Sequence, residues 1–268
     1  MFYQKYWHLR DMPFRPSPDP RYFFFLPQYE EALAAALYVL TEGAGGMLLT
    51  GDCGCGKTLI TRVLVDELDP ERFEVALLTH PNLKPSEFLA EILRQYGLDS
   101  SGWDKSRMLA ELQSFLIQTR KRGAQALVIV DEGQLVEDTL TLEEIRLLLN
   151  FQENTSFYLT LILVGQPELR DRVESKPQLQ ERLSVRHHLS TMSPEATRRY
   201  LEHRLERAGG GVDIFTGPAE DILVAASGGI PRRLNYLADR ALLAGYSLKL
   251  PLLDDELVGR VVKQVALA

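Results

Sequence analysis

One eight-residue segment constrains this chain more than any other. Gly51–Thr58 reads GDCGCGKT and fits the pattern G-x-x-x-x-G-K-[ST], between an apolar run and a helical pattern, as that motif requires. Backbone N–H groups of such a turn point inward around phosphate oxygens, and the N-terminus of the following helix adds positive potential. The alternative is a plain glycine turn with an incidental lysine, which the complete motif in this context disfavours.

The motif assigns roles to individual side chains. We expect Lys57 to reach the β- and γ-phosphates of a bound nucleotide and the Thr58 hydroxyl to ligate Mg²⁺. The other residues expected to line the nucleotide are Gly51, Asp52, Cys53, Gly54, Cys55, Gly56 and Leu59. Cys53 and Cys55 could serve redox control, but we favour their role as small loop residues.

A second motif follows an apolar run at residues 127–130. Asp131 and Glu132 come directly after it, which brings two carboxylates to the carboxyl edge of the expected sheet. We expect Asp131 to hold the Mg²⁺ and Glu132 to orient and polarise the attacking water. The alternative is a strand that runs into a solvated acidic turn. Together the two motifs predict hydrolysis of a nucleoside triphosphate, with ATP and Mg²⁺ as cofactors.

Short apolar runs alternate with helical patterns through the middle of the chain. Four runs read as strands buried on both faces, at Met47–Thr50, Phe73–Thr79, Ala126–Val130 and Tyr158–Val164. The alternation predicts right-handed crossovers and an α/β fold of the P-loop NTPase type, with a mainly parallel five-stranded sheet flanked by helices. After Ser193 the patterns are helical only, so we expect a small C-terminal α-helical lid domain.

The first residues have a different composition. Four prolines lie within Pro13–Pro20, so this segment cannot be a helix or a central strand and must be an ordered strap or a floppy arm. The aromatic residues around it favour the strap, because so much aromatic surface would be sticky in water. The expected domains are therefore a strap at 1–27, a nucleotide-binding α/β domain at 28–192 and the lid at 193–268.

Phosphoryl transfer needs cations and a polar group beyond Lys57 and Mg²⁺. Gln166 follows an apolar run and is expected near the γ-phosphate, although it could be a turn residue before a proline. Arg182 is expected to cross to the γ-phosphate of a neighbouring subunit, with Arg186 as the alternative, and either could be a surface ion-pair partner. Arg232 opens a lid helix and is expected to fold back onto the nucleotide of its own subunit.

Two further polar residues each have two possible roles. His80 could sense the γ-phosphate or simply end a strand, and we favour the second role. Asn150 could cap a helix or lie on the surface.

Composition excludes several classes of protein. With 268 residues, 45% hydrophobic and 25% charged, the chain is too apolar for intrinsic disorder. No apolar run is long enough to span a membrane, the start is unlike a secretory signal, and the two cysteines favour a reducing compartment. We therefore expect a cytoplasmic protein. The net charge of −7 argues against a surface generally coated by nucleic acid.

Several motifs resemble the AAA+ ATPase module of the general secretion pathway protein A (ExeA-type) family, which is related to MSHA-pilus and exosortase-locus secretion ATPases. The resemblance is carried by the proline-rich strap, GDCGCGKT, VDEGQ at 130–134, LEEIRLLLNFQ at 142–152, LILVGQPEL at 161–169, QERLSVRHHL at 180–189 and GGIPRRLN at 228–235. It implies an α/β ATPase domain with a helical lid, homo-oligomeric rings or partial rings, and ATP-driven assembly of secretion or pilus machinery.

Two departures from the family pattern qualify what the resemblance implies. Family members usually continue into a transmembrane helix and a periplasmic part after the lid, so any membrane or wall partner of this chain is expected to be another polypeptide. Gln28-Tyr29-Glu30 stands where the strap usually leads into a histidine, which puts the adenine contacts in doubt. Gly133 stands where alanine is commoner, and this change should alter little.

The sequence therefore predicts an Mg-ATP hydrolase that couples turnover to oligomer assembly, with an arginine finger in trans. It would act on a secretion, pilus or export partner, either free in the cytoplasm or recruited to the inner membrane by that partner. One alternative is an ATP-dependent DNA-transposition regulator of the TniB or TnsC type. The arginine-rich stretch 182–207 supports this alternative. Another is a nucleotide-gated scaffold with little turnover.

Overall fold

The computed structural model describes residues 2–153 and 156–267. The chain divides into two compact units. The sheet unit comprises Pro27–Cys53 and Ile60–Leu189, and the strap-lid unit comprises the chain up to Leu26, Gly54–Leu59 and the chain from Ser190 onward. The domain limits expected from the sequence stay a prediction.

A five-stranded parallel sheet organises the sheet unit, as the sequence predicts. Its strand order is β2-β3-β6-β1-β7, so the first strand of the chain lies between the two last strands of the sheet, β6 and β7. The strands are β1 (Gly46–Gly51), β2 (Phe73–Leu78), β3 (Gln125–Val130), β6 (Leu159–Gly165) and β7 (Val185–Leu189). All four pairs are parallel. The edge strand β7 is the one that the sequence patterns did not locate.

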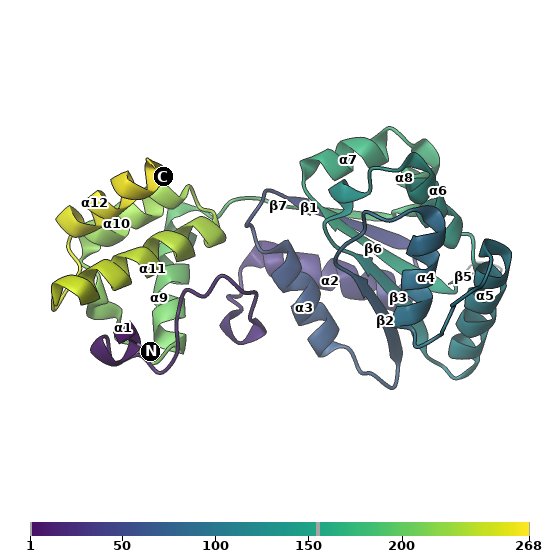
Figure 1. The fold of residues 1–268 in the computed structure, drawn as a ribbon, viewed down its shortest axis with the longest axis horizontal. Coiled ribbons are helices and arrows are strands. Elements are labelled where there is room, and N and C mark those ends of the chain that lie inside the picture. Colours follow the sequence, from purple (N-terminus) through teal and green to yellow (C-terminus); the bar gives the residue numbers. More distant parts are fainter. Residues whose placement is uncertain (1, 154–155, 268) are drawn as a thin grey trace. The chain divides into compact units, whose positions relative to one another are not determined.

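Helices connect and cover the strands (Figure 1). They are α2 (Pro27–Glu42), α3 (Lys57–Glu67), α4 (Pro85–Gln95), α5 (Lys105–Lys121), α6 (Thr139–Leu148), α7 (Pro167–Glu174) and α8 (Pro177–Arg182). A short 3-10 turn η2 (Gly133–Leu135) follows β3, and a small hairpin of β4 (Gln152–Glu153) and β5 (Ser156–Phe157) precedes β6. The motif LEEIRLLLNFQ at 142–152 therefore lies only partly in a helix, because α6 ends at Leu148, before the hairpin.

The sheet is buried on both faces. Ala126, Val128 and Val130 of β3 belong to one core cluster with residues of α4, α5 and α6, such as Phe88 and Leu112. The intervening Leu127 and Ile129 are equally buried and face the other side, because successive side chains of a strand alternate. Burial of both faces explains the continuous apolar runs in the sequence.

The strap-lid unit consists of helices and the loops that connect them, and its C-terminal part is drawn in green to yellow in Figure 1. Its helices are α1 (Phe2–Tyr6), η1 (Pro20–Tyr22), α9 (Pro194–Arg207), η3 (Val212–Ile214), α10 (Gly217–Ser227), α11 (Pro231–Leu248) and α12 (Asp255–Ala266). The four main helices, α9 to α12, follow Ser193, where the sequence predicts helical patterns only.

The N-terminal strap packs against these helices. The Trp7 indole N–H donates a hydrogen bond of 3.0 Å to the carbonyl of Leu242 on α11. Phe24 packs edge-on against Tyr200 of α9, with ring centroids 5.9 Å apart. The strap is therefore ordered, and its aromatic residues form part of the core of this unit.

Among the described residues, no helix combines the length and the apolar character that crossing a membrane requires.

Candidate functional site

The carboxyl ends of three neighbouring strands lie at one edge of the sheet. In the ladder, Val130 of β3 pairs with Leu163 of β6, and Thr50 of β1 pairs with Gly165 of β6. The chain therefore leaves the sheet at the same edge after all three strands. Asp131, Gln166 and the start of the glycine loop follow these ends, and β6 lies between the other two. Ligands of open α/β sheets bind at such an edge.

The glycine loop joins β1 to α3 and adopts the backbone shape that its motif predicts. Gly54 and Gly56 have φ angles of +87° and +100°, which side-chain-bearing residues rarely adopt. Lys57 opens α3 and is 6% exposed. Of its two cysteines, Cys53 is exposed and Cys55 is buried.

A lid residue meets this loop within the strap-lid unit. Arg232 lies in the first turn of α11, and its backbone N–H donates a hydrogen bond of 3.3 Å to the carbonyl of Gly54. A Cβ atom at Gly54 would lie 2.8 Å from the Cβ of Arg232, so only glycine allows this approach. The structure thus places Arg232 beside the loop, and its role toward a nucleotide stays a prediction.

Two acidic residues, Asp131 and Glu132, follow β3 and differ in backbone conformation. Asp131 is 3% exposed, its N–H donates to the carbonyl of Leu78 at 2.9 Å, and its Oδ1 accepts the N–H of Glu132 at 2.8 Å. Glu132 has φ +53° and ψ 37°, the left-handed region, which costs a residue with a Cβ about 1 kcal/mol. A strained backbone conformation persists only where contacts with the surrounding structure stabilise it, and such positions cluster at functional sites.

The donor chemistry here fits the expected cofactors. Asp131 and Thr58 offer a carboxylate and a hydroxyl, the hard oxygen ligands that Mg²⁺ takes alongside water and phosphate. Lys57 is a buried cation beside two glycines with positive φ, and a glycine-rich turn of this kind suits a polyphosphate anion. Each of these groups is therefore of the chemical kind that a magnesium nucleotide requires.

Gln134 is a polar residue at this edge for which the sequence analysis predicts no role. Its Nε2 donates to the Glu132 Oε2 at 2.5 Å, and its Oε1 accepts the backbone N–H of Gln166 at 3.0 Å. One side chain thus joins Glu132, the second residue after β3, to Gln166, the first residue after β6. Its place at the end of VDEGQ was the available signal, but the reach of the side chain depends on the η2 turn.

The two candidate finger residues lie away from this edge. Arg182 ends α8, next to the start of β1 and β7, and its Nη1 donates to the Gln152 Oε1 at 3.2 Å. Its guanidinium lies 5.6 Å from the ring centroid of Phe157. Arg186 is exposed on β7, and its Nη2 donates to the carbonyl of Gln180 at 3.2 Å. The structure therefore does not bring Arg182 together with Asp131 and Glu132 of its own chain.

The two residues left open by the sequence are both exposed. His80 follows β2 at the carboxyl edge, and its Nδ1 lies 3.1 Å from the hydroxyl of Thr79. Asn150 lies in the turn after α6, where its N–H donates to the carbonyl of Leu147 at 2.9 Å.

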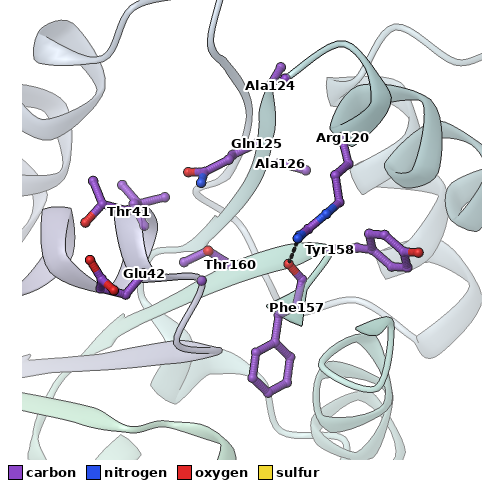
Figure 2. A pocket seen from close by; sticks show the side chains of 12 residues that line it. Thr41, Glu42, Arg120, Ala124, Gln125, Ala126, Phe157, Tyr158 and Thr160 are labelled. Carbon is purple, nitrogen blue, oxygen red and sulfur yellow. Dashed lines mark hydrogen bonds between the residues drawn. The ribbon is translucent and has the colours of Figure 1, made fainter. Parts of the chain in front are cut away.

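A separate pocket of about 250 Å³ lies at the opposite, amino edge of the sheet (Figure 2). It is lined by the end of α2 and by the first residues of β3 and β6, including Gln125 and Thr160. Arg120 reaches into it from α5 and donates to the carbonyl of Phe157 at 3.3 Å. Because it opens at the other end of the strands, this pocket is not part of the candidate site.

Comparison with known proteins places the chain among ATPase modules. Residues 40–173 match the family described as AAA domain. The chain is 35% identical over 248 residues to general secretion pathway protein A of Aeromonas hydrophila, which confirms the resemblance read from the motifs. That alignment covers 91% of this chain but 45% of the relative, so the chain spans less than half the length of the relative.

Two solved structures share the fold. The ORC2 protein of Aeropyrum pernix, in ADPNP-ADP complexes, superposes with a TM-score of 0.70 at 17% identity, covering 92% of this chain and 72% of that one. The Cdc6p protein of Pyrobaculum aerophilum gives a TM-score of 0.73 at 18% identity, covering 94% of this chain and 70% of that one. At such low identity these likenesses show the fold alone.

Proposed function

This chain belongs to the AAA domain family, and on that premise we propose that it binds ATP with Mg²⁺ and hydrolyses it. The observation that carries the proposal is the buried Asp131 with Glu132 at the end of β3, one strand away from the glycine loop that follows β1. The fold and the loop alone would suit nucleotide binding. The acidic pair adds the groups that hydrolysis needs.

Each residue of the site has one role in this proposal. Lys57 and the loop amides bind the phosphates, and Thr58 and Asp131 hold the metal. Glu132 accepts a hydrogen bond from the attacking water and orients it, while Gln166 contacts the γ-phosphate. Bound Mg²⁺ would neutralise part of the charge on the phosphate oxygens. Arg232 approaches the nucleotide from the lid.

We further propose that the active form is a homo-oligomer, a ring or partial ring. Arg182 precedes β7 at the amino edge of the sheet, whereas Asp131 follows β3 at the carboxyl edge. Because both belong to the sheet unit, Arg182 cannot serve the carboxylates of its own chain. Support for a role in trans is therefore geometric, and Arg186 is the alternative finger.

The proposed partner rests on the similarity to a secretion protein and not on the geometry of the nucleotide site. General secretion pathway protein A gives the secretion role its support, so we propose that turnover in the cytoplasm drives the assembly of a secretion, pilus or export machine. A separate membrane protein would recruit the ATPase to the inner membrane. Salt-dependent binding of duplex DNA in the presence of ATP would instead favour the transposition-regulator alternative.

Steady-state phosphate release from Mg-ATP tests the proposal, together with equilibrium binding of ATP. The Glu132→Gln variant should keep ATP affinity and lose turnover by 100-fold or more, on the order of the contribution of a positioned general base. Glu137→Gln is the matched control, because Glu137 is exposed and lies five residues further on. Equal turnover in the wild type and Glu132→Gln would contradict the proposed role. ATP binding with negligible release by the wild type would favour the scaffold alternative.

A further inference from the structure

The Gln134 amide has only one orientation that fits its surroundings. A carboxylate can only accept hydrogen bonds, and a backbone N–H can only donate. The Nε2 must therefore face Glu132, and the Oε1 must face the N–H of Gln166. The structure has this orientation, with 2.5 Å from Nε2 to the Glu132 Oε2 and 3.0 Å from Oε1 to the Gln166 nitrogen. A flipped amide would oppose oxygen to oxygen and nitrogen to nitrogen.

The surroundings of Gln134 hold its amide in this place. Its own carbonyl accepts the Arg172 Nη1 at 3.0 Å, and the Arg172 Nη2 donates to the carbonyl of Glu137 at 3.1 Å, so one guanidinium from α7 holds two carbonyls of the segment 134–137. A Cβ atom at Gly165 would lie 2.8 Å from the Gln134 Oε1. The absence of a side chain at Gly165 therefore leaves room for the amide to reach Gln166.

From this arrangement we propose that Gln134 is a positioning residue that holds the Glu132 carboxylate in place and ties it to the Gln166 turn. By binding one carboxylate oxygen, Gln134 fixes the direction in which the other oxygen meets the attacking water. The same amide fixes the backbone of Gln166, whose side chain we assign to the γ-phosphate. The inference rests on the proposed ATP hydrolysis and adds how its water-orienting group is placed.

Two variants separate the two hydrogen bonds. Gln134→Glu keeps the size of the side chain and an acceptor for the Gln166 N–H, but sets a second carboxylate against Glu132. Gln134→Met keeps a similar volume and loses both bonds. The matched control is Gln118→Glu, which makes the same charge change on the exposed side chain of α5.

The first measurement is kcat together with the KM for ATP. In Gln134→Glu we expect kcat to fall by about ten-fold or more, because the Glu132 carboxylate loses its donor and is pushed away from its place by a second carboxylate. The KM should stay within about two-fold of the wild type, since the contacts that bind ATP are unchanged. A loss of nucleotide binding would instead raise the KM.

The second measurement needs no nucleotide and no turnover. Hydrogen exchange of the Gln166 amide should be about five-fold faster in Gln134→Met, the loss expected for one hydrogen bond, and close to the wild type in Gln134→Glu. The proposal is overturned if Gln134→Glu matches Gln118→Glu in kcat, or if exchange at Gln166 is the same in Gln134→Met and the wild type. If the wild type hydrolyses no ATP, the proposed function fails, and the exchange experiment still decides whether Gln134 ties the two turns.

Discussion

The guanidinium of Arg204 lies over the ring of Tyr22, 4.4 Å from the ring centroid, and joins the lid to the N-terminal strap. Arg204 is 3% exposed, and its Nε donates to the carbonyl of Pro13 at 2.5 Å. A buried guanidinium is stable only when its charge and its donors find partners. Here an aromatic face and a backbone carbonyl, both from the strap, supply them.

Arg204→Lys should therefore loosen the strap. Lysine keeps the charge but loses the planar stacking and the fixed donor to Pro13, so the free energy of unfolding of the strap-lid unit should fall by about 2 kcal/mol. Chemical denaturation followed by Trp7 fluorescence measures the loss. Arg207→Lys, an exposed position on the same helix, should change it by less than about 0.5 kcal/mol. Equal effects of the two substitutions would show that the strap contributes nothing through Arg204.

Two helical glycines of the same unit should respond to alanine with opposite signs. At Gly245 of α11, an added Cβ would meet the Leu253 side chain and lie 2.9 Å from the Trp7 Cζ2, so Gly245→Ala should destabilise by about 1–3 kcal/mol. At Gly259 of α12 the nearest atom is 4.0 Å away, so Gly259→Ala should stabilise by up to about 1 kcal/mol through helix propensity. Thermal unfolding of both variants checks the signs. Stabilisation by both would mean that Trp7 and Leu253 do not pack against Gly245.

His203 should make the strap-lid unit sensitive to mild acid. Burial lowers the pKa of His203 below its ordinary value of 6.5, and the nearby positive charges of Arg207 and Arg204 lower it further. Its ring packs against Phe24, with centroids 5.1 Å apart. Since the unfolded chain then binds the proton more readily than the folded one, protonation favours unfolding as the pH falls through 6.5 toward the lower folded pKa.

His203→Phe keeps an aromatic ring and removes this titration. The difference in unfolding free energy between His203→Phe and the wild type should therefore grow in favour of the variant between pH 7 and pH 5. Urea denaturation at several pH values in this window measures it. Parallel curves for the two proteins would rule out a protonation penalty at His203.

Mixing two inactive variants tests the proposed finger in trans. Arg182→Ala keeps its own Glu132, and Glu132→Gln keeps its own Arg182, so mixed oligomers should contain complete sites and regain phosphate release. Each variant alone should be slower than the wild type, with up to about 10³-fold lost without the finger. Arg186→Ala mixed in the same way is the control for the alternative residue. If mixtures never exceed the sum of their components, Arg182 does not act across a subunit boundary.

The sequence predicted the central strands well because they are buried on both faces. Their continuous apolar runs do not depend on the neighbours that the sheet finally provides. The edge strand β7 was not located, since it pairs only with β1 and exposes Arg186 and His188 on alternate positions. Its VRHHL sequence therefore lacks the apolar run that marks a central strand. The short helices α7 and α8 were also missed, although Pro167 and Pro177 stand at their first turns.

The sequence placed the loop and the acidic pair at the correct strand ends, because the motifs and the apolar runs before them are local patterns. The role of Gln134 could not be predicted in this way. Its two hydrogen bonds depend on the left-handed backbone of Glu132 and on the space left by Gly165, which only the folded chain shows. The location of Arg182 at the opposite edge likewise depends on where α8 meets β1.

A crystal structure with Mg²⁺ and a non-hydrolysable ATP analogue tests the central claim most directly. We expect the triphosphate against the amides of Gly54–Thr58, with Lys57 on its outer phosphates and the metal held by Thr58 and Asp131. Glu132 should then face the γ-phosphate across one ordered water. Analogue phosphates bound away from the loop, or a metal that neither Thr58 nor Asp131 approaches, would contradict the account.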